Sequence, residues 1–153
     1  MTPYAETSAV LRWLFNESGG DEILELLRSS TKVVCSRLTL IETYRSLRRA
    51  VALGELAETT AAEVRAVLAQ ASARWALLEI SSAVGERAEQ AFPVEPVRTL
   101  DAIHLASALL LRQSIPDLSV LSTDTRVRDN ASQLGFDVFP TSAEPEPSAP
   151  GSR

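Results

Sequence analysis

Short apolar segments with the length of β-strands alternate with amphipathic helical segments along most of this chain. Residues 75–80 fit either a strand or the end of the preceding helix. Strands that alternate with helices indicate a three-layer α/β domain. We therefore predict a mostly parallel sheet of four to five strands, flanked by helices. The expected strands are 2–6, 32–36, 118–121 and 136–139, and the expected helices are 8–15, 21–29, 38–53, 82–92, 99–112 and 125–134, with a further helix that starts at Thr59.

The length and composition indicate one globular domain. The chain has 153 residues, of which 45% are hydrophobic and 23% are charged, and these proportions are ordinary for a globular protein. A chain of this size buries about two-thirds of its unfolded surface. Pro, Ser, Glu and Gly dominate after residue 140, and such a composition does not support a packed core. We expect a folded domain at residues 1–140 and a disordered tail at residues 141–153.

Nothing in the sequence predicts a membrane segment or a secretion signal. No apolar stretch reaches the roughly 18 residues that would span a bilayer. The first residues contain neither a basic segment nor a hydrophobic run. Cys35 is the only cysteine, and its apolar neighbours indicate a buried strand residue rather than a nucleophile. We expect a cytoplasmic protein.

The charge of the chain does not identify its partner. A net charge of −5 gives no global attraction for nucleic acid. Lys32 is the only lysine, and all other basic residues are arginine, which binds phosphate through two parallel hydrogen bonds. A coding bias towards Arg and Ala explains this preference equally well. The Walker pattern, the dinucleotide glycine fingerprint and the Cys/His metal spacings are all absent from the sequence.

Four acidic residues stand beside apolar segments, where a chain rarely leaves a carboxylate. Glu6 and Asp124 follow the first strand and a late strand, Asp101 falls in the first turn of the most apolar helix, and Glu42 lies in a long helix. Ligands of parallel sheets collect at the carboxyl ends of the strands, and a helix N-terminus favours negative charge. Because acids are seldom buried unless they are paired or bind a metal, we expect these four to share one pocket.

A pocket of four carboxylates predicts metal-dependent hydrolysis. Carboxylates a few ångströms apart repel one another, so the cluster must raise its pKa values or recruit a cation. Ligands that are all oxygen atoms suit Mg²⁺ or Mn²⁺, which also bind substrate phosphates. Such an ion activates a bound water and offsets the charge that develops at phosphorus. Phosphodiester hydrolysis is the reaction class that these residues favour.

Each acid also has a purely structural interpretation. Glu42 could complete a capping box with Thr39, and Asp101 could be a charge favoured at the start of its helix. Asp124 could be an N-cap, and Glu6 could be an exposed turn residue. None of the four is specific alone, and their joint placement carries the functional hypothesis.

Four segments resemble, in order and spacing, the successive motifs of PIN-domain ribonucleases, and especially those of VapC-type toxins from bacterial toxin–antitoxin pairs. The third segment is the most specific of them. The resemblance covers about residues 3–139, nearly the whole expected domain. The segments are Glu-Thr-Ser-Ala-Val-Leu from Glu6, Ser-Arg-Leu-Thr-Leu-Ile-Glu up to Glu42, Arg-Thr-Leu-Asp-Ala-Ile-His-Leu-Ala from Arg98, and Leu-Ser-Thr-Asp up to Asp124.

The resemblance implies a PIN fold and an endoribonuclease that depends on Mg²⁺ or Mn²⁺. It also implies a homodimer, an RNA substrate and inhibition by a small VapB-like antitoxin. Its catalytic and metal-binding residues would be Glu6, Glu42, Asp101 and Asp124. By the same matching of motifs, the side chains of three neighbours would hold these acids by hydrogen bonds. These neighbours are Thr7, Ser8 and Thr123.

One residue departs from the family pattern. The first motif of the family usually has aspartate, whereas this chain has Glu6. The extra methylene moves the carboxylate by roughly 1.5 Å, and Mg²⁺ demands near-ideal octahedral geometry. The alternative hypothesis is therefore a catalytically weakened PIN-like module that binds RNA or an antitoxin without cleaving.

Several other residues have a functional and a structural interpretation. His104, the only histidine, is either a general base or, as we favour, a core-edge histidine bonded to backbone or to Asp101. Arg98 contacts a scissile phosphate or forms a surface salt bridge. Asp129 is an additional ligand or, as we favour, a solvated helix residue.

Two further groups are candidates for contacts with partners. Three arginines of the Glu42 helix follow an RNA backbone or form an ordinary solvated face. Three apolar residues of the first helix belong to a groove for a partner peptide or fill the core. The two groups are Arg45, Arg48 and Arg49, and Trp13, Leu14 and Phe15.

Overall fold

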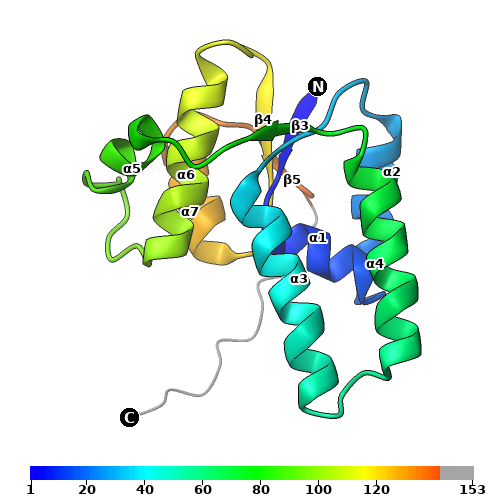
Figure 1. Cartoon of the computed structure of the whole chain (residues 1–153). Helices are drawn as coiled ribbons and strands as arrows, with labels where there is room; N and C mark the ends of the chain where they lie inside the picture. The colour runs from blue at the N-terminus through cyan, green and yellow to red at the C-terminus, as the bar shows by residue number, and fades with distance from the viewer. Residues whose placement is uncertain (142–153) are drawn as a thin grey trace.

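The computed structural model describes residues 1–141 and confirms the predicted alternation of strands and helices (Figure 1). Apart from Thr141, the predicted tail at residues 141–153 lies outside the described residues. No helix within residues 1–141 is long and apolar enough to cross a bilayer. The elements are β1 (Thr2–Ala5), α1 (Thr7–Leu14), α2 (Gly20–Ser29), β2 (Val34–Ser36), α3 (Arg37–Ala52), α4 (Glu58–Ser72), β3 (Ala76–Leu78), α5 (Ser82–Ala88), α6 (Thr99–Arg112), β4 (Leu118–Leu121), α7 (Thr125–Gln133) and β5 (Val138–Phe139).

The strands form one parallel sheet in the order β3-β2-β1-β4-β5, so the first strand of the chain lies at its centre. β1 pairs with β4 along its whole length, from Thr2 opposite Leu118 to Ala5 opposite Leu121. Residues 75–80, which the sequence left between two assignments, contain the edge strand β3. The predicted mostly parallel sheet of four to five strands is therefore confirmed, with five strands in the described part.

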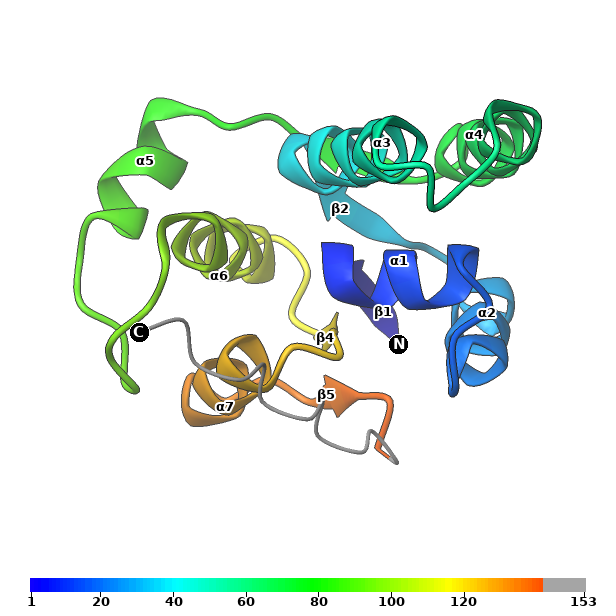
Figure 2. The same ribbon diagram turned by 90° about the horizontal axis from the view of Figure 1, so that it is seen from below.

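Helices cover both faces of the sheet, and alternate residues of each strand point into two separate cores. Figure 2 shows the sheet between α6 and α7 on one side and α1 and α2 on the other. On β1, Tyr4 belongs to the core under α6 and α7, whereas Ala5 belongs to the core under α1 and α2. Val120 and Leu121 of β4 divide between the cores in the same way. Because both faces are covered, the strands are apolar runs without the polar alternation of a half-exposed sheet.

Three helices begin where a strand ends, and each has a side chain that caps its first turn. Glu6 caps α1 after β1, Ser36 caps α3 after β2, and Asp124 caps α7 shortly after β4. A capping oxygen accepts hydrogen bonds from backbone N–H groups that have no partner within the helix. Because β1, β2 and β4 are parallel, their carboxyl ends and these helix starts gather at one edge of the sheet. This carboxyl edge faces the viewer in Figure 2.

Helix α5 is shorter than the predicted segment 82–92. It ends at Ala88, and Phe92 packs into the core under α6 and α7. The backbone N–H of Phe92 donates to the Glu95 carboxylate at 2.9 Å, in place of a helical carbonyl. Phe92, the last residue of the predicted helix, is therefore a loop residue that is held by burial and by a hydrogen bond to a side chain.

Cys35 is fully buried in β2, as predicted, and we expect it to be unreactive in the native protein. Its exposed fraction is 0%, and burial raises the pKa of its thiol to about 12. At pH 8 only about one thiol in ten thousand would then be ionised, and thiolate is the reactive form. Titration with a thiol reagent such as dithionitrobenzoate should label no cysteine in the folded protein and one per chain in denaturant. Rapid labelling of the native protein would contradict this interpretation.

Candidate functional site

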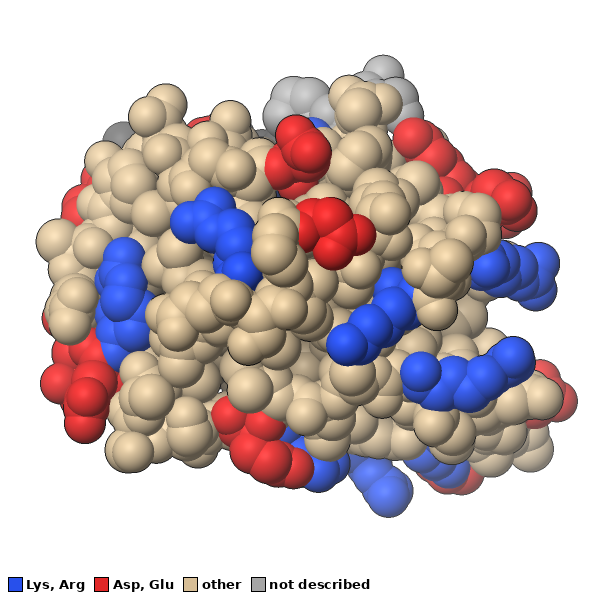
Figure 3. Space-filling model, turned by 90° about the horizontal axis from the view of Figure 1, so that it is seen from above, with Lys and Arg blue, Asp and Glu red and all other residues tan. Residues whose placement is uncertain are grey.

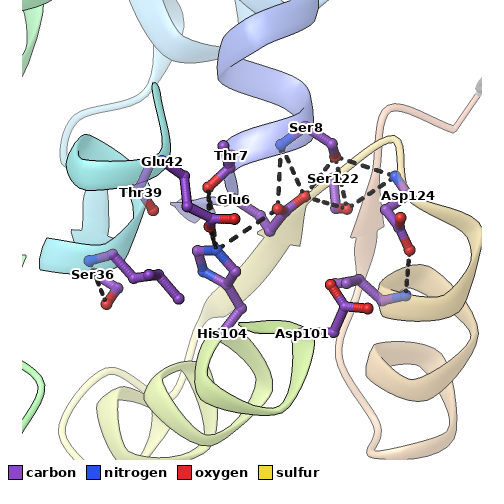
Figure 4. Close-up of polar contacts among 12 residues, drawn as sticks. Glu6, Thr7, Ser8, Ser36, Thr39, Glu42, Asp101, His104, Ser122 and Asp124 are labelled. Carbon is purple, nitrogen blue, oxygen red and sulfur yellow. Dashed lines mark hydrogen bonds and ion pairs between the residues drawn. The ribbon is translucent and has the colours of Figure 1, made fainter. Parts of the chain in front are cut away.

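The four predicted acids lie at the carboxyl edge of the sheet (Figure 4). Glu6 directly follows β1, Glu42 lies in the second turn of α3, Asp101 lies in the first turn of α6, and Asp124 directly precedes α7. The fold thus brings together residues from both ends of the domain. Their contacts divide them into two pairs, Glu6 with Glu42 and Asp101 with Asp124.

Glu6 is buried and folds back onto the start of α1. Its side chain is 6% exposed, so the interpretation as an exposed turn residue is wrong. Both carboxylate oxygens accept from the backbone N–H of Ser8 at 3.1 Å, and Oε2 also accepts from the hydroxyl groups of Ser8 and Ser122. The longer side chain of Glu6 therefore serves as an N-cap at the same time as it lies in the site.

Glu42 is held by two donors from different elements. Its Oε1 lies 2.6 Å from Nε2 of His104 and accepts from the Thr7 hydroxyl at 2.8 Å. Partial burial raises the pKa of Glu42, but the hydrogen bonds from His104 and Thr7, together with the charge of Arg98, outweigh it and lower the pKa below its usual value. Glu42 is therefore stabilised as a carboxylate.

The predicted capping box between Glu42 and Thr39 does not form. Helix α3 begins earlier, at Arg37, and Ser36 caps it by accepting from the Leu38 N–H at 3.1 Å. The Thr39 hydroxyl instead donates to the carbonyl oxygen of Ala5 at 3.0 Å. Thr39 thereby joins α3 to β1. The Glu42 carboxylate makes its hydrogen bonds within the site instead.

Asp101 and Asp124 share a contact with Arg98. Nε of Arg98 donates to Oδ2 of Asp101 at 3.1 Å, and Nη2 donates to Oδ2 of Asp124 at 3.4 Å. Asp124 also caps α7 by accepting from the Val127 N–H at 3.0 Å through Oδ1. The interpretation of Asp124 as an N-cap is thus confirmed, and its Oδ2 still lies in the site. Arg98 forms the predicted salt bridge, and both of its partners are site acids.

Two serines connect the first and last motifs. The Ser8 Oγ accepts from the backbone N–H groups of Thr123 and Asp124 at 2.9 and 3.1 Å. Ser122 donates to Glu6 at 2.7 Å, a role that the sequence analysis missed although Ser122 directly follows β4. The prediction that the Thr123 side chain holds an acid is wrong, because its buried hydroxyl has no hydrogen-bond partner among the described residues. The backbone of Thr123, through Ser8, makes the connection instead.

The donor chemistry of this site fits a hard divalent cation, because the four acids offer only carboxylate oxygens. As the side chains lie in the structure, no three His, Cys, Asp or Glu residues of the described part are grouped closely enough to hold an ion. His104 lies between Glu6 and Glu42, with its Nε2 3.7 Å from the nearer oxygen of Glu6, and Arg98 bridges Asp101 and Asp124. Each pair of acids thus has its own nitrogen donor.

The remaining predicted residues take the following places. His104 is 1% exposed and bonds Glu42, so its predicted contact with Asp101 or the backbone is wrong. Asp129 is exposed on α7. A depression of about 550 Å³ on α3 is lined by Arg45, Ser46, Arg48, Arg49, Ala52 and Leu53.

A groove runs along α4 beside the first helix. Trp13 and Leu14 pack against the core under α1 and α2, and together with Phe15 they also line a cavity of about 430 Å³ against α4. Trp13 and Val67 continue into a second cavity of about 430 Å³. Both interpretations of Trp13 and Leu14, core and groove, are therefore compatible with the structure.

Comparison with known proteins identifies the class of this domain. The profile of the PIN domain matches residues 4–133, and the chain belongs to the PIN-domain family. Ribonuclease VapC46 of Mycobacterium tuberculosis is 35% identical over 137 residues, which are 89% of this chain and 95% of that protein. Ribonuclease VapC35 of the same species is 31% identical over 137 residues, which are 88% of this chain and 93% of that protein. Within the family, the chain thus belongs with the VapC ribonucleases.

Solved structures share the same fold. The VapBC2 complex of Rickettsia felis, bound to a DNA fragment from its promoter, matches with a TM-score of 0.59 at 11% identity and covers 90% of this chain and 97% of that one. VapC20 of Mycobacterium tuberculosis, a toxin that cleaves the sarcin-ricin loop, matches with a TM-score of 0.60 at 16% identity and covers 88% and 95%. The predicted PIN-like fold is confirmed. PIN-domain VapC ribonucleases generally depend on a divalent metal ion.

Proposed function

We propose that this chain, a VapC-type endoribonuclease and the toxin of a VapBC pair, hydrolyses RNA phosphodiester bonds at the carboxyl edge with the help of Mg²⁺ or Mn²⁺. The observation that carries the proposal is that Glu6, Glu42, Asp101 and Asp124 lie together at that edge. Four carboxylates repel the phosphates of RNA unless a cation offsets their charge. A divalent ion bound there would offset part of that charge and bind phosphate oxygens.

The four acids would hold the ion once their side chains move closer together than they lie in this structure, and the other side chains would position them. When bound, a divalent cation lowers the pKa of a water molecule and offsets negative charge at phosphorus. The hydrogen bonds to Glu6 and Glu42 keep two of the carboxylates in fixed orientations before substrate arrives. The side chain of Arg98 is 63% exposed beside Asp101 and Asp124, which places it to donate to a phosphate oxygen of bound RNA.

The metal dependence can be tested directly on the wild-type protein. Purified protein should cleave total RNA when Mg²⁺ or Mn²⁺ is supplied and should lose that activity in EDTA. Adding excess Mg²⁺ after EDTA should restore the cleavage. Equal cleavage with and without chelator would contradict the metal-dependent mechanism.

A second candidate function is favoured by the contacts of Glu6. Its carboxylate accepts from the Ser8 N–H and from two hydroxyl groups, so its oxygens already have protein donors. A module weakened by this arrangement would bind RNA or an antitoxin without cleaving. Comparison of the wild type with Glu6→Asp in the same assay separates the two candidates. A wild type that is inert with either metal, together with an active Glu6→Asp variant, would establish the second.

The antitoxin is proposed to occupy the groove along α4. Trp13 and Val67 line both of its cavities, and Val67 is 47% exposed although it is apolar. Three cationic residues, Arg28, Lys32 and Arg74, are among those that line one of the cavities. Figure 3 shows basic side chains, with acidic ones beside them, on the right, which is the side of α2 and α4 in Figure 1. An apolar peptide segment that carries carboxylates would complement this groove.

Substitution of Val67 by aspartate should weaken the antitoxin complex. The new carboxylate would be buried against Trp13 in the complex, and an unpaired buried charge costs several kcal/mol. The control is Val94→Asp, because Val94 is 41% exposed and lines neither cavity of the groove. Calorimetric titration with the antitoxin encoded beside the toxin gene should show at least about tenfold weaker binding for Val67→Asp only. Equal affinities of the two variants would place the antitoxin elsewhere.

Three further expectations from the resemblance and the sequence stay predictions. They are a homodimer, which light scattering on a sizing column would detect, a cytoplasmic location, and, as the alternative to an ordinary solvated face, contact of RNA with the arginines of α3. The depression lined by Arg45, Arg48 and Arg49 supports the last of these.

A further inference from the structure

His104 has more polar contacts than a histidine that only fills the core. It is the only histidine of the chain, it is 1% exposed, and it projects from α6 towards β1 and α3. Its Nδ1 lies 2.7 Å from the hydroxyl of Tyr4. Its Nε2 lies 2.6 Å from Oε1 of Glu42 and 3.1 Å from the hydroxyl of Thr7. Both ring nitrogens are thus engaged inside the protein.

In the neutral form of the ring, the chemistry of these partners favours one position of the ring proton. An ionised carboxylate only accepts hydrogen bonds, so the contact between Nε2 and Glu42 favours a proton on Nε2. A neutral imidazole carries one ring proton, which leaves Nδ1 as an acceptor. The hydroxyl of Tyr4 must then donate to Nδ1. Tyr4 is 1% exposed, so this contact is shielded from solvent.

The same contacts hold one of the two oxygens of the Glu42 carboxylate, Oε1. Nε2 of His104 and the hydroxyl of Thr7 both donate to Oε1. In the described part of the chain, Oε2 of Glu42 has no hydrogen-bond partner. A carboxylate that is held through one oxygen keeps its second oxygen available in a defined orientation.

We propose that Tyr4 and His104 are positioning residues for Glu42. The hydroxyl of Tyr4 holds His104 as the tautomer with the proton on Nε2, and Nε2 then fixes Oε1 so that Oε2 is presented to a divalent cation. The role for the cation rests on the proposed function, whereas the tautomer does not. The buried strand β1 thereby acts on the site through a ring that belongs to α6.

The tautomer can be measured on the intact protein because the chain has one histidine. Long-range ¹H–¹⁵N spectra of the labelled imidazole at neutral pH should show a protonated Nε2 and an unprotonated Nδ1. In Tyr4→Phe the donor to Nδ1 is lost, and we expect the nitrogen shifts to move towards the average of two tautomers. A wild type with the proton on Nδ1, or on both nitrogens, would overturn the proposal.

The effect on the site is measured as affinity for Mn²⁺ alone, followed by electron paramagnetic resonance. Tyr4→Phe should weaken Mn²⁺ binding about tenfold, at the lower end of what loss of a group that orients a metal ligand costs. Thr7→Val, which removes the other donor to Oε1, should weaken it similarly while His104 keeps its tautomer. The control is Tyr44→Phe, which changes the other tyrosine of the chain and should leave the spectra and the affinity unchanged.

The outcomes separate this proposal from the proposed function. Unchanged imidazole spectra and Mn²⁺ affinity in folded Tyr4→Phe would overturn the positioning role. A wild type that binds no Mn²⁺ and cleaves no RNA would overturn the proposed function and the positioning of a metal ligand together. In that case the imidazole spectra would still decide the arrangement of Tyr4, His104 and Glu42.

Discussion

Replacement of Asp101 by asparagine should reduce RNA cleavage by at least about a hundredfold and leave the fold intact. Asparagine has nearly the same shape but no charge, so the variant loses one anionic ligand from the site. A hundredfold decrease corresponds to about 2.7 kcal/mol of transition-state stabilisation, which is modest for a group that holds a catalytic metal ion. Initial rates on a labelled RNA, with circular dichroism to verify folding, would measure the effect.

Asp124→Asn provides an independent test of the same site. Asparagine is as good an N-cap as aspartate, so the bond from the Val127 N–H and helix α7 should survive while the charge is lost. The matched control is Asp129→Asn, because Asp129 is exposed on the same helix. We expect Asp129→Asn to cleave at the wild-type rate. If Asp101→Asn and Asp124→Asn also cleaved at that rate, the acidic site would have no catalytic role.

Gly20→Ala should destabilise the protein, because a side chain at this position collides with the backbone of α1. A Cβ atom placed on Gly20 would lie 2.8 Å from the carbonyl oxygen of Arg12 and 3.3 Å from Cα of Trp13. Neither atom is the end of a flexible side chain, so one helix must move. Overpacking of this kind costs about 1–3 kcal/mol. Urea denaturation should show a lower midpoint for the variant.

Gly85→Ala is the matched control. Gly85 lies in α5, and a Cβ atom added there would have no atom within 4 Å apart from those of its chain neighbours and of the nearby backbone of its own helix. Alanine is about 1 kcal/mol more favourable than glycine inside a helix, so this variant should be slightly more stable than the wild type. If Gly20→Ala were as stable as Gly85→Ala, the two helices α1 and α2 could move apart without a loss of stability, and the predicted collision would be wrong.

The fold could be predicted well where the sequence pattern is strong and local. Helix α6 has the predicted bounds, 99–112, because its apolar run starts after a polar segment and ends at Arg112. Residues 75–80 could not be assigned, because a three-residue edge strand has no periodicity of its own. Pairing with β2, whose Val34 lies opposite Ala76, makes that segment a strand.

The candidate site was less predictable than the fold, because its contacts depend on how helices pack. The spacing of one turn suggested that His104 contacts Asp101, but the ring reaches across to Tyr4 on β1 and Glu42 on α3. Similarly, the link from Arg98 to Asp124 joins residues of two elements that are far apart in the chain. Sequence motifs identified the acids as a group, and the packing of α3 against α6 decided their partners.

The central place of β1 determines when this toxin can become active during its own synthesis. The first strand leaves the ribosome first, but its neighbour in the sheet, β4, ends only at Leu121. The Ser8 hydroxyl accepts hydrogen bonds from the backbone of Thr123 and Asp124, which are synthesised later still. A nascent chain that stops short of these residues lacks one side of the sheet and the acid Asp124. Translation must therefore pass nearly the whole domain before the site is complete and RNA can be cleaved.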